Sequence, residues 1–413
     1  MRLHFHSSFL SMLVLLIGLG TILITILSPR DISMGDTYTL ETVQTHPTAD
    51  NVGRVFAGII LAISLYKIFS VFQQGKVPRS GSEIYIGYLL FFICSVLIAA
   101  IVGHGAFDIR FLYAPIILTA VYVTRPISTA QLLFLGKLIL LIYIYGSLLA
   151  AVLAPSWALM GTNTSILPSV DTRLFGVSSQ ANQLGPLVAA YIVIELLLPV
   201  RSILRTVHLA AAFLVLIWTQ SKTSWLFVLL TLIYLVFIKI ERALFPTSSS
   251  RKGFAKFVFY SLGIAVSMIS VAVLIYFDPM NSSIGVESLT GRTVIWAITL
   301  NAWSDNPVFG YGLGLWDIDF RNQYGLPFAG QAHNQFIHTL GSSGLVGLFG
   351  LLIYLGVMAK RALKISKTNS VALALLFLIV VESMTETPLR NGDILSGFFF
   401  LQLLLFAQLM SDR

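Results

Sequence analysis

The sequence is poor in charged residues. Asp, Glu, Lys and Arg make up 11% of its 413 residues, whereas hydrophobic residues make up 56%. A typical soluble domain has about 25% charged residues, because water must solvate its surface. The mean hydropathy of +0.86 also shows that apolar residues predominate. The composition therefore excludes a soluble globular domain and predicts an integral membrane protein.

Cysteine is nearly absent as well. Cys94 is the one cysteine of the sequence and lies inside an apolar segment, which excludes a disulfide framework and a thiolate metal cluster. His333 and His338 are five residues apart, so they would not share one helix face, and no HExxH motif occurs. We therefore expect neither a metal site nor another cofactor.

Apolar segments long enough to cross a bilayer, about 20 residues each, recur from one end of the chain to the other. They predict an all-α polytopic membrane protein with about twelve transmembrane helices. The predicted spans are residues 8–28, 52–72, 84–102, 111–124, 130–153, 183–200, 203–219, 224–240, 255–277, 334–358, 371–385 and 394–410. No internal repeat or soluble segment interrupts them, so residues 1–413 are expected to form a single integral membrane domain.

Basic residues mark every second connection between the predicted spans. Examples are Lys76, Arg125, Arg201, Arg251 and Lys360. Because basic connections stay in the cytoplasm, both termini are expected there, and the long connections 154–182 and 278–333 are expected in the periplasm or cell exterior. The net charge of +8 then reflects membrane topology, and nucleic acid is not an expected partner.

The connection at 278–333, between the ninth and tenth predicted spans, carries most of the unusual sequence. The spacing of apolar residues and tryptophans in 290–303 predicts a short helix lying in the membrane interface, with Thr290 as a possible cap. The glycines of FGYGLG (309–314) suggest a phosphate loop, but no strand precedes them and no GK[ST] follows. A tight turn is therefore the favoured interpretation of this segment.

Several cations gather at the outer ends of the predicted spans. They are Arg173, Lys222, Arg292, Arg321 and Arg390. A charge beside an apolar segment is costly unless a partner or a water-filled cavity receives it. Basic side chains that converge outside the membrane, with His333 nearby, would suit a lipid-linked diphosphate.

Five motifs occur in a distinctive order: SKTS (221–224), TGRTVIW (290–296), NPVFGYGLG (306–314), AHNQF (332–336) and SGLVGL (343–348). In this order they resemble the O-antigen ligase and O-antigen polymerase superfamily, and most of all its exopolysaccharide-production-type polymerases. RLFGVSSQANQLGP (173–186) also resembles an outward segment of that superfamily. The resemblance covers about residues 173–348, whereas the first 150 residues are similar only in hydropathy.

The resemblance implies a GT-C-like fold and a metal-independent membrane glycosyltransferase. Such an enzyme transfers a glycan from undecaprenyl diphosphate to an acceptor sugar hydroxyl, at the periplasmic face of the bacterial inner membrane. The expected activity is polymerisation of a surface polysaccharide or exopolysaccharide. The expected partners are membrane lipids, the lipid-linked glycan, a glycan or lipid-anchored acceptor, and the flippase and chain-length regulator of the same pathway.

Carried over residue by residue, the resemblance implies that Arg292 and Lys222 hold the diphosphate and that His333 acts at the acceptor hydroxyl. Neutral imidazole is a suitable base near pH 7, and fixed cations stabilise the charge on a departing phosphate. The other expected substrate-binding residues are Arg173, Arg321, Asn182, Asn334 and Gln335. Many relatives have arginine in place of Lys222, and lysine keeps the charge but lacks the bidentate fork.

Several alternatives remain open from the sequence. Three outward acids are alternatives to His333 as the base: Glu386, Asp317 and Asp319. An O-antigen ligase would instead transfer a finished chain to lipid A core. A polysaccharide transporter or flippase also fits twelve spans, although Glu195 and Glu382 are the only acids inside them. A scaffold or length regulator without catalytic activity is a further alternative. Sugar identity, linkage and oligomeric state are not indicated.

Overall fold

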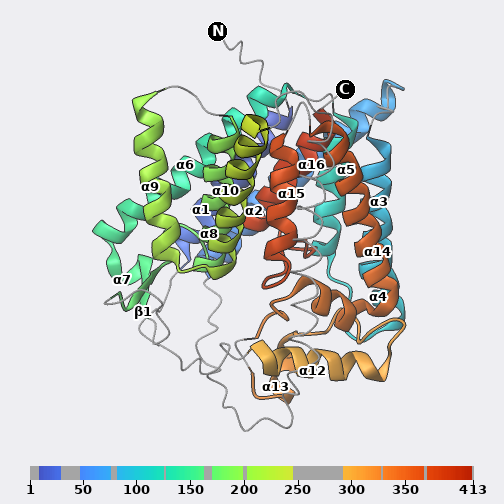
Figure 1. The fold of residues 1–413 in the computed structure, drawn as a ribbon. Coiled ribbons are helices and arrows are strands. Elements are labelled where there is room, and N and C mark those ends of the chain that lie inside the picture. The colour runs from blue at the N-terminus through green and yellow to red at the C-terminus, as the bar shows by residue number, and fades with distance from the viewer. Residues whose placement is uncertain are drawn as a thin grey trace.

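The computed structural model describes residues 9–28, 47–75, 81–124, 127–161, 170–198, 202–244, 292–326, 329–366 and 370–411. Within these ranges the chain is mostly helical, and most of the helices pack side by side into one bundle (Figure 1). One small antiparallel sheet occurs in the described part, formed by β1 (Leu159–Gly161) and β2 (Thr172–Leu174), with Met160 opposite Arg173.

The bundle helices lie where hydropathy predicts them. They are α1 (Phe9–Leu27), α2 (Pro47–Gln73), α3 (Ser82–Phe92), α4 (Ile98–Val102), α5 (Tyr113–Val123), α6 (Thr129–Leu153), α8 (Ala181–Leu197), α9 (Ile203–Thr219), α10 (Lys222–Leu244), α14 (Gln335–Ile365), α15 (Ser370–Glu382) and α16 (Gly397–Ser411). A π-helical turn, Ile93–Leu97, joins α3 to α4, a 3-10 turn, Ile109–Leu112, precedes α5, and the short α7 (Pro155–Ala158) precedes β1. The predicted span at 255–277 lies outside the described residues.

Length separates these helices into two groups. Five are long and apolar enough to cross a membrane: α1, α2, the continuous segment from α3 to α4, α6 and α14. Six others in the described ranges, among them α8, α15 and α16, have shorter apolar stretches of 10–17 residues. The structure therefore supports a helical membrane protein, while twelve spans, a single domain and GT-C-like architecture stay predictions.

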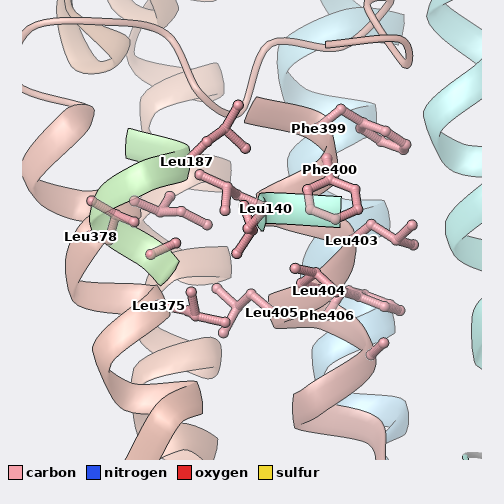
Figure 2. Close-up of a cluster of buried hydrophobic side chains, with 14 of the residues drawn as sticks. Leu140, Leu187, Leu375, Leu378, Phe399, Phe400, Leu403, Leu404, Leu405 and Phe406 are labelled. Carbon is pink, nitrogen blue, oxygen red and sulfur yellow. The ribbon is translucent and has the colours of Figure 1, made fainter. Parts of the chain in front are cut away.

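Helix α16 lies inside the bundle and is buried along its described side chains, residues 397–410. Figure 2 shows its side chains facing leucines of three neighbouring helices, α6, α8 and α15. The residues labelled on α16 are Phe399, Phe400, Leu403, Leu404, Leu405 and Phe406, and those labelled on the neighbouring helices are Leu140, Leu187, Leu375 and Leu378; all belong to one buried cluster. A helix that is apolar on all sides suits such a central position.

Glu195, in α8, is a buried acid inside the bundle. Lys137 Nζ of α6 donates to its Oε2 at 2.9 Å, and Arg205 Nε of α9 lies 3.6 Å from its Oε1. A buried charge is tolerated when a partner compensates it. Because Glu195 already has two cationic neighbours, it offers little support for a carrier with an ionisable transport site in the membrane.

The outer connection contains two helices, α12 (Arg292–Asp305) and α13 (Ile318–Gln323). The short helix predicted within 290–303 is thus confirmed as α12, while its possible cap Thr290 lies outside the described residues. Figure 1 shows α12 lying crosswise at one end of the bundle. Its buried residues Ile295 and Ala302 pack with Trp316 and Phe320 in a second, smaller apolar core.

The FGYGLG segment is held by backbone hydrogen bonds on both sides. The Tyr311 and Gly312 N–H groups donate to the carbonyls of Gly341 and Ser342 in α14, at 2.7 and 2.9 Å. On the other side, the His104 N–H donates to the Tyr311 carbonyl at 2.7 Å. Gly312 has φ +115°, and a Cβ there would collide with the His104 backbone, so only glycine fits.

Helix α14 is kinked where this segment meets it. Gly344 has φ 62° and ψ −160°, which interrupts the helical backbone. The Leu345 and Val346 N–H groups donate to the carbonyls of Pro307 and Val308, at 3.0 and 3.1 Å. The glycine-rich segment therefore has a structural role: it joins the outer connection to the bundle through main-chain contacts.

Candidate functional site

The polar groups at the outer end of the bundle converge on one carboxylate, that of Glu386. Asn182 Nδ2 and Arg292 Nη2 donate to its Oε1 at 2.9 and 3.0 Å. On Oε2, Gln331 Nε2 donates and His333 Nδ1 makes its contact, both at 3.0 Å. These partners come from α8, α12 and the segment before α14, so the fold joins three distant parts of the sequence. The Glu386 side chain is 2% exposed.

Glu386 is ionised at neutral pH. Burial alone would raise the pKa of its carboxyl, but the hydrogen bond of His333 and its charge when the ring is protonated, then the charge of Arg292 and the Asn182 bond, together hold that pKa below its ordinary value. An ionised carboxylate accepts about four hydrogen bonds, and here four partners occupy it. The geometry therefore favours Glu386 as an orienting group over its alternative role as the base.

His333 is held in a fixed tautomer by this contact. Because the Glu386 carboxylate can only accept, Nδ1 of His333 carries a hydrogen, and in the neutral ring Nε2 then has the lone pair. The residue has φ 48°, in the left-handed region that few residues other than glycine adopt. Its side chain is 23% exposed. Strained backbone at a polar, partly accessible residue is typical of functional sites.

Arg173 is linked to the cluster through Asn182. Its Nη2 donates to Asn182 Oδ1 at 2.7 Å, and its Nε donates to the Thr219 carbonyl at 3.0 Å. Burial, and then the neighbouring charge of Arg292, lower the pKa of Arg173, against the opposing effect of Glu386. Two guanidinium groups thus share the field of one carboxylate, which leaves an excess of positive charge suited to an anion.

Lys222 lies beside the cluster without bonding to it. It begins α10 and is exposed, and no described residue is a partner for its ammonium group. The next residue, Thr223, has its hydroxyl 2.7 Å from that of Thr385, directly before Glu386 in the chain. The start of α10 is therefore fixed against the Glu386 segment, with the Lys222 side chain available at its edge.

Arg321 is placed elsewhere. It lies on α13 and is not among the four partners of Glu386, and its charge acts on Arg390 instead. The two acids of the same region, Asp317 and Asp319, are exposed, and Asp317 Oδ1 accepts the Phe320 N–H at 2.8 Å as the cap of α13. Neither acid contacts Glu386 or lines the cavity beside His333, so the geometry gives no support to them as the base.

Asn334 and Gln335 have structural contacts. Asn334 Oδ1 caps α14 by accepting the N–H groups of Phe336 and Ile337, and its Nδ2 donates to the Met384 carbonyl. Gln335 Oε1 accepts the Leu389 N–H, and its Nε2 donates to the Thr339 hydroxyl. Both amides therefore hold the start of α14 against the segment that carries Glu386, and sugar binding by them stays a prediction.

Gln331 is a site residue that the sequence did not single out. Besides its bond to Glu386, its Oε1 accepts the hydroxyl of Thr387. Both ends of the amide are fixed, next to the imidazole of His333. A glutamine in a loop gives no signal of its own in a single sequence, because its importance depends on which side chains the fold places around it.

A polar cavity of about 230 Å³ opens beside His333. Its polar lining includes Gln180, Gln183, Gln331, Thr387, Arg390 and Asp393, and Pro388 and Phe398 form apolar parts of its wall. Arg292, Arg173 and Lys222 are not part of the lining. The cavity thus lies on the Oε2 side of Glu386, with His333, whereas Arg292 and, through Asn182, Arg173 lie on the Oε1 side.

Comparison with known proteins adds a family to this geometry. Residues 207–352 match the family model described as O-antigen ligase. The matched stretch contains Lys222, Arg292 and His333, whereas Arg173, Asn182 and Glu386 lie outside it. No curated protein matches the chain. The resemblance to the O-antigen ligase and O-antigen polymerase superfamily is confirmed by this match.

Proposed function

We propose that this chain is a membrane glycosyltransferase and a polysaccharide polymerase, on the basis of its resemblance to the O-antigen ligase and O-antigen polymerase superfamily. It transfers a glycan from undecaprenyl diphosphate to an acceptor sugar hydroxyl at the periplasmic face of the inner membrane. One observation carries the proposal: Arg292 and His333 contact opposite oxygens of the buried Glu386 carboxylate, each at 3.0 Å. A cation for the diphosphate and a base for the hydroxyl therefore lie side by side.

The base in this mechanism is Nε2 of His333. The acceptor oxygen attacks the anomeric carbon of the donor sugar from the face opposite the diphosphate, and its proton passes to Nε2. The new C–O bond forms as the bond from the anomeric carbon to the phosphate oxygen breaks, and that oxygen keeps the electron pair. The anomeric configuration is inverted. Glu386 accepts the Nδ1–H and stabilises the imidazolium that forms.

The leaving group needs stabilisation of negative charge more than a proton. Arg292 lies next to the base, Arg173 is linked to the same carboxylate through Asn182, and Lys222 lies at the nearby start of α10. Fixed cations in a site with little water stabilise such charge strongly. We expect these three residues to hold the diphosphate, so that the reaction proceeds without a metal ion.

The choice of a polymerase over a ligase depends on the acceptor. The sequence resembles exopolysaccharide-production-type polymerases most, which favours a second lipid-linked repeat unit as the acceptor. A ligase would use the same base and cations to transfer a finished chain to lipid A core. A flippase that delivers the donor and a chain-length regulator are the partners expected in either pathway.

The test is a deletion strain complemented with variants. His333→Ala and Arg292→Ala are expected to abolish surface polysaccharide and to accumulate single lipid-linked repeat units, while the proteins still insert at normal levels. Arg54→Ala is the matched control, because Arg54 is an exposed arginine of α2 away from the site. Full polysaccharide with His333→Ala would refute the base, and long chains stranded on the carrier would identify a ligase.

A further inference from the structure

We infer that the cavity beside His333 is the subsite for the acceptor sugar and that it selects an uncharged sugar. The inference rests on the proposed function, because it assumes that His333 deprotonates an acceptor hydroxyl. It goes further by assigning residues to the acceptor and by naming the chemical class of sugar. None of these lining residues belongs to the diphosphate-binding set, which is Arg292, Arg173 and Lys222.

The two oxygens of Glu386 separate the site into two sides. On Oε1 lie Arg292 and, through Asn182, Arg173, so the diphosphate belongs there. On Oε2 lie His333 and Gln331, and both of these line the cavity. In an inverting displacement the nucleophile approaches opposite the leaving group. The acceptor must then enter on the His333 side, which is where the cavity lies.

The lining of the cavity suits sugar hydroxyls. Gln180 is exposed and Gln183 is half-buried, and their side-chain amides have no partner in the part of the chain that the structure describes. Each amide offers donors and an acceptor, the combination that pairs with hydroxyl groups. Phe398 and Pro388 add apolar surface for the C–H face of a sugar ring. The volume of about 230 Å³ is suited to one sugar ring rather than a whole repeat unit.

The charges of the lining indicate which sugar it takes. Arg390 and Asp393 carry opposite charges that interact with each other, and they are the charged residues of the described lining besides the titratable His333. Arg390 Nη1 also donates to the Gly330 carbonyl at 3.1 Å. The positive and negative charges therefore compensate each other. A carboxylate on the sugar would be repelled by Asp393 and would have to compete with Asp393 for Arg390, whereas hydroxyls can bond to both residues without separating the pair.

The test measures binding of monosaccharides to the purified full chain in nanodiscs by saturation-transfer-difference NMR. The probes are glucose, galactose, N-acetylglucosamine and glucuronic acid. We expect at least one uncharged sugar to bind more tightly than glucuronic acid. Gln180→Ala and Gln183→Ala should each weaken that binding about threefold to tenfold, the effect of one lost hydrogen bond. Gln323→Ala is the control, since Gln323 is an exposed glutamine of α13 outside the lining.

Asp393→Asn gives a second, opposite readout. It removes the negative charge while keeping an oxygen acceptor, so glucuronic acid binding should rise relative to the uncharged sugars. Preferential binding of glucuronic acid to the unaltered protein, or equal binding by the glutamine variants and Gln323→Ala, would overturn the inference. The complementation assay decides the proposed function separately, because sugar binding is measured without any transfer reaction.

Discussion

At the scale of single residues, Glu386 determines what His333 can do. It is buried, ionised and bonded by four partners, so it fixes the imidazole tautomer and leaves Nε2 to accept a proton. Without a carboxylate on Nδ1, either ring nitrogen could carry the hydrogen, and Nε2 would no longer be kept free to accept a proton. Glu386 is therefore a positioning residue in the proposed mechanism.

Glu386→Gln tests this role with little change in shape. The amide can donate to Nδ1 and so favour the wrong tautomer of His333. We expect kcat for glycan transfer to fall about 10²- to 10⁴-fold, with KM for the lipid-linked donor nearly unchanged. The measurement is steady-state transfer by purified protein in nanodiscs.

Asp319→Asn is the matched control, because Asp319 is an exposed acid of α13. It should leave kcat unchanged. If Glu386→Gln retained full kcat, or raised KM alone, the tautomer argument would be wrong.

The sequence predicts Arg292 and His333 as site residues, but it does not predict the central position of Glu386 between them. Arg292 and His333 are predictable because a charged or ionisable side chain at the end of an apolar segment is costly without a partner or a water-filled cavity. The structure brings both residues to Glu386. The sequence indicates Glu386 only as an outward acid, since its burial arises only when α8, α12 and the segment before α14 meet. The cap role of Asn334 had a local signal, an asparagine directly before a helix.

At the scale of elements, the contacts of residues 307–314 attach the outer connection to the bundle. Their hydrogen bonds reach His104 on one side and the kinked part of α14 on the other. Helix α14 itself begins at the cap Asn334, which directly follows His333. The geometry of the site therefore depends on main-chain contacts that carry no functional side chain.

Gly312→Ala is expected to disrupt this attachment. An alanine would be strained at φ +115°, and its Cβ would collide with the His104 backbone. We expect a loss of at least about 1–3 kcal/mol in stability, seen as a lower unfolding temperature of the purified protein, together with reduced transfer.

Gly356→Ala is the matched control in α14. Gly356 is exposed, and a Cβ there meets nothing within 4 Å. This substitution should stabilise the helix by about 0.5–1 kcal/mol. Equal unfolding temperatures for the two variants would contradict the structural role of the glycine-rich segment.

Hydropathy located the bundle helices well, because a membrane helix needs a long apolar run and the chain has few other features. Hydropathy does not predict how the connection at 278–333 attaches to the helix bundle. The glycines of FGYGLG suggested a turn, but which backbones they approach is decided by contacts between segments some 200 residues apart, such as His104 and Tyr311. The number of spans also stays open, because several apolar helices are shorter than a bilayer requires.

At the scale of the whole molecule, the orientation in the membrane decides whether the site can meet a periplasmic substrate. The basic connections predict that α13 faces the periplasm and that the end of α2 faces the cytoplasm. Cys94 is buried, so Cys94→Ala provides a background without a native thiol. Asn322→Cys and Gln74→Cys then place single thiols at exposed positions of the two sides.

In intact cells a membrane-impermeant maleimide is expected to label Asn322→Cys and not Gln74→Cys. Permeabilised cells should show labelling of both variants, which controls for thiol reactivity. The reverse pattern in intact cells would place the site in the cytoplasm, and a periplasmic polymerase would then be excluded.

The main-chain attachment of residues 307–314 also limits how this chain can be recombined with similar proteins. An outer connection transplanted alone into another scaffold would lose its partners around His104 and in the part of α14 from Gly341 to Val346. A working chimera must therefore exchange all three segments together. Attempts to change glycan specificity by loop grafting should treat these segments as one cassette.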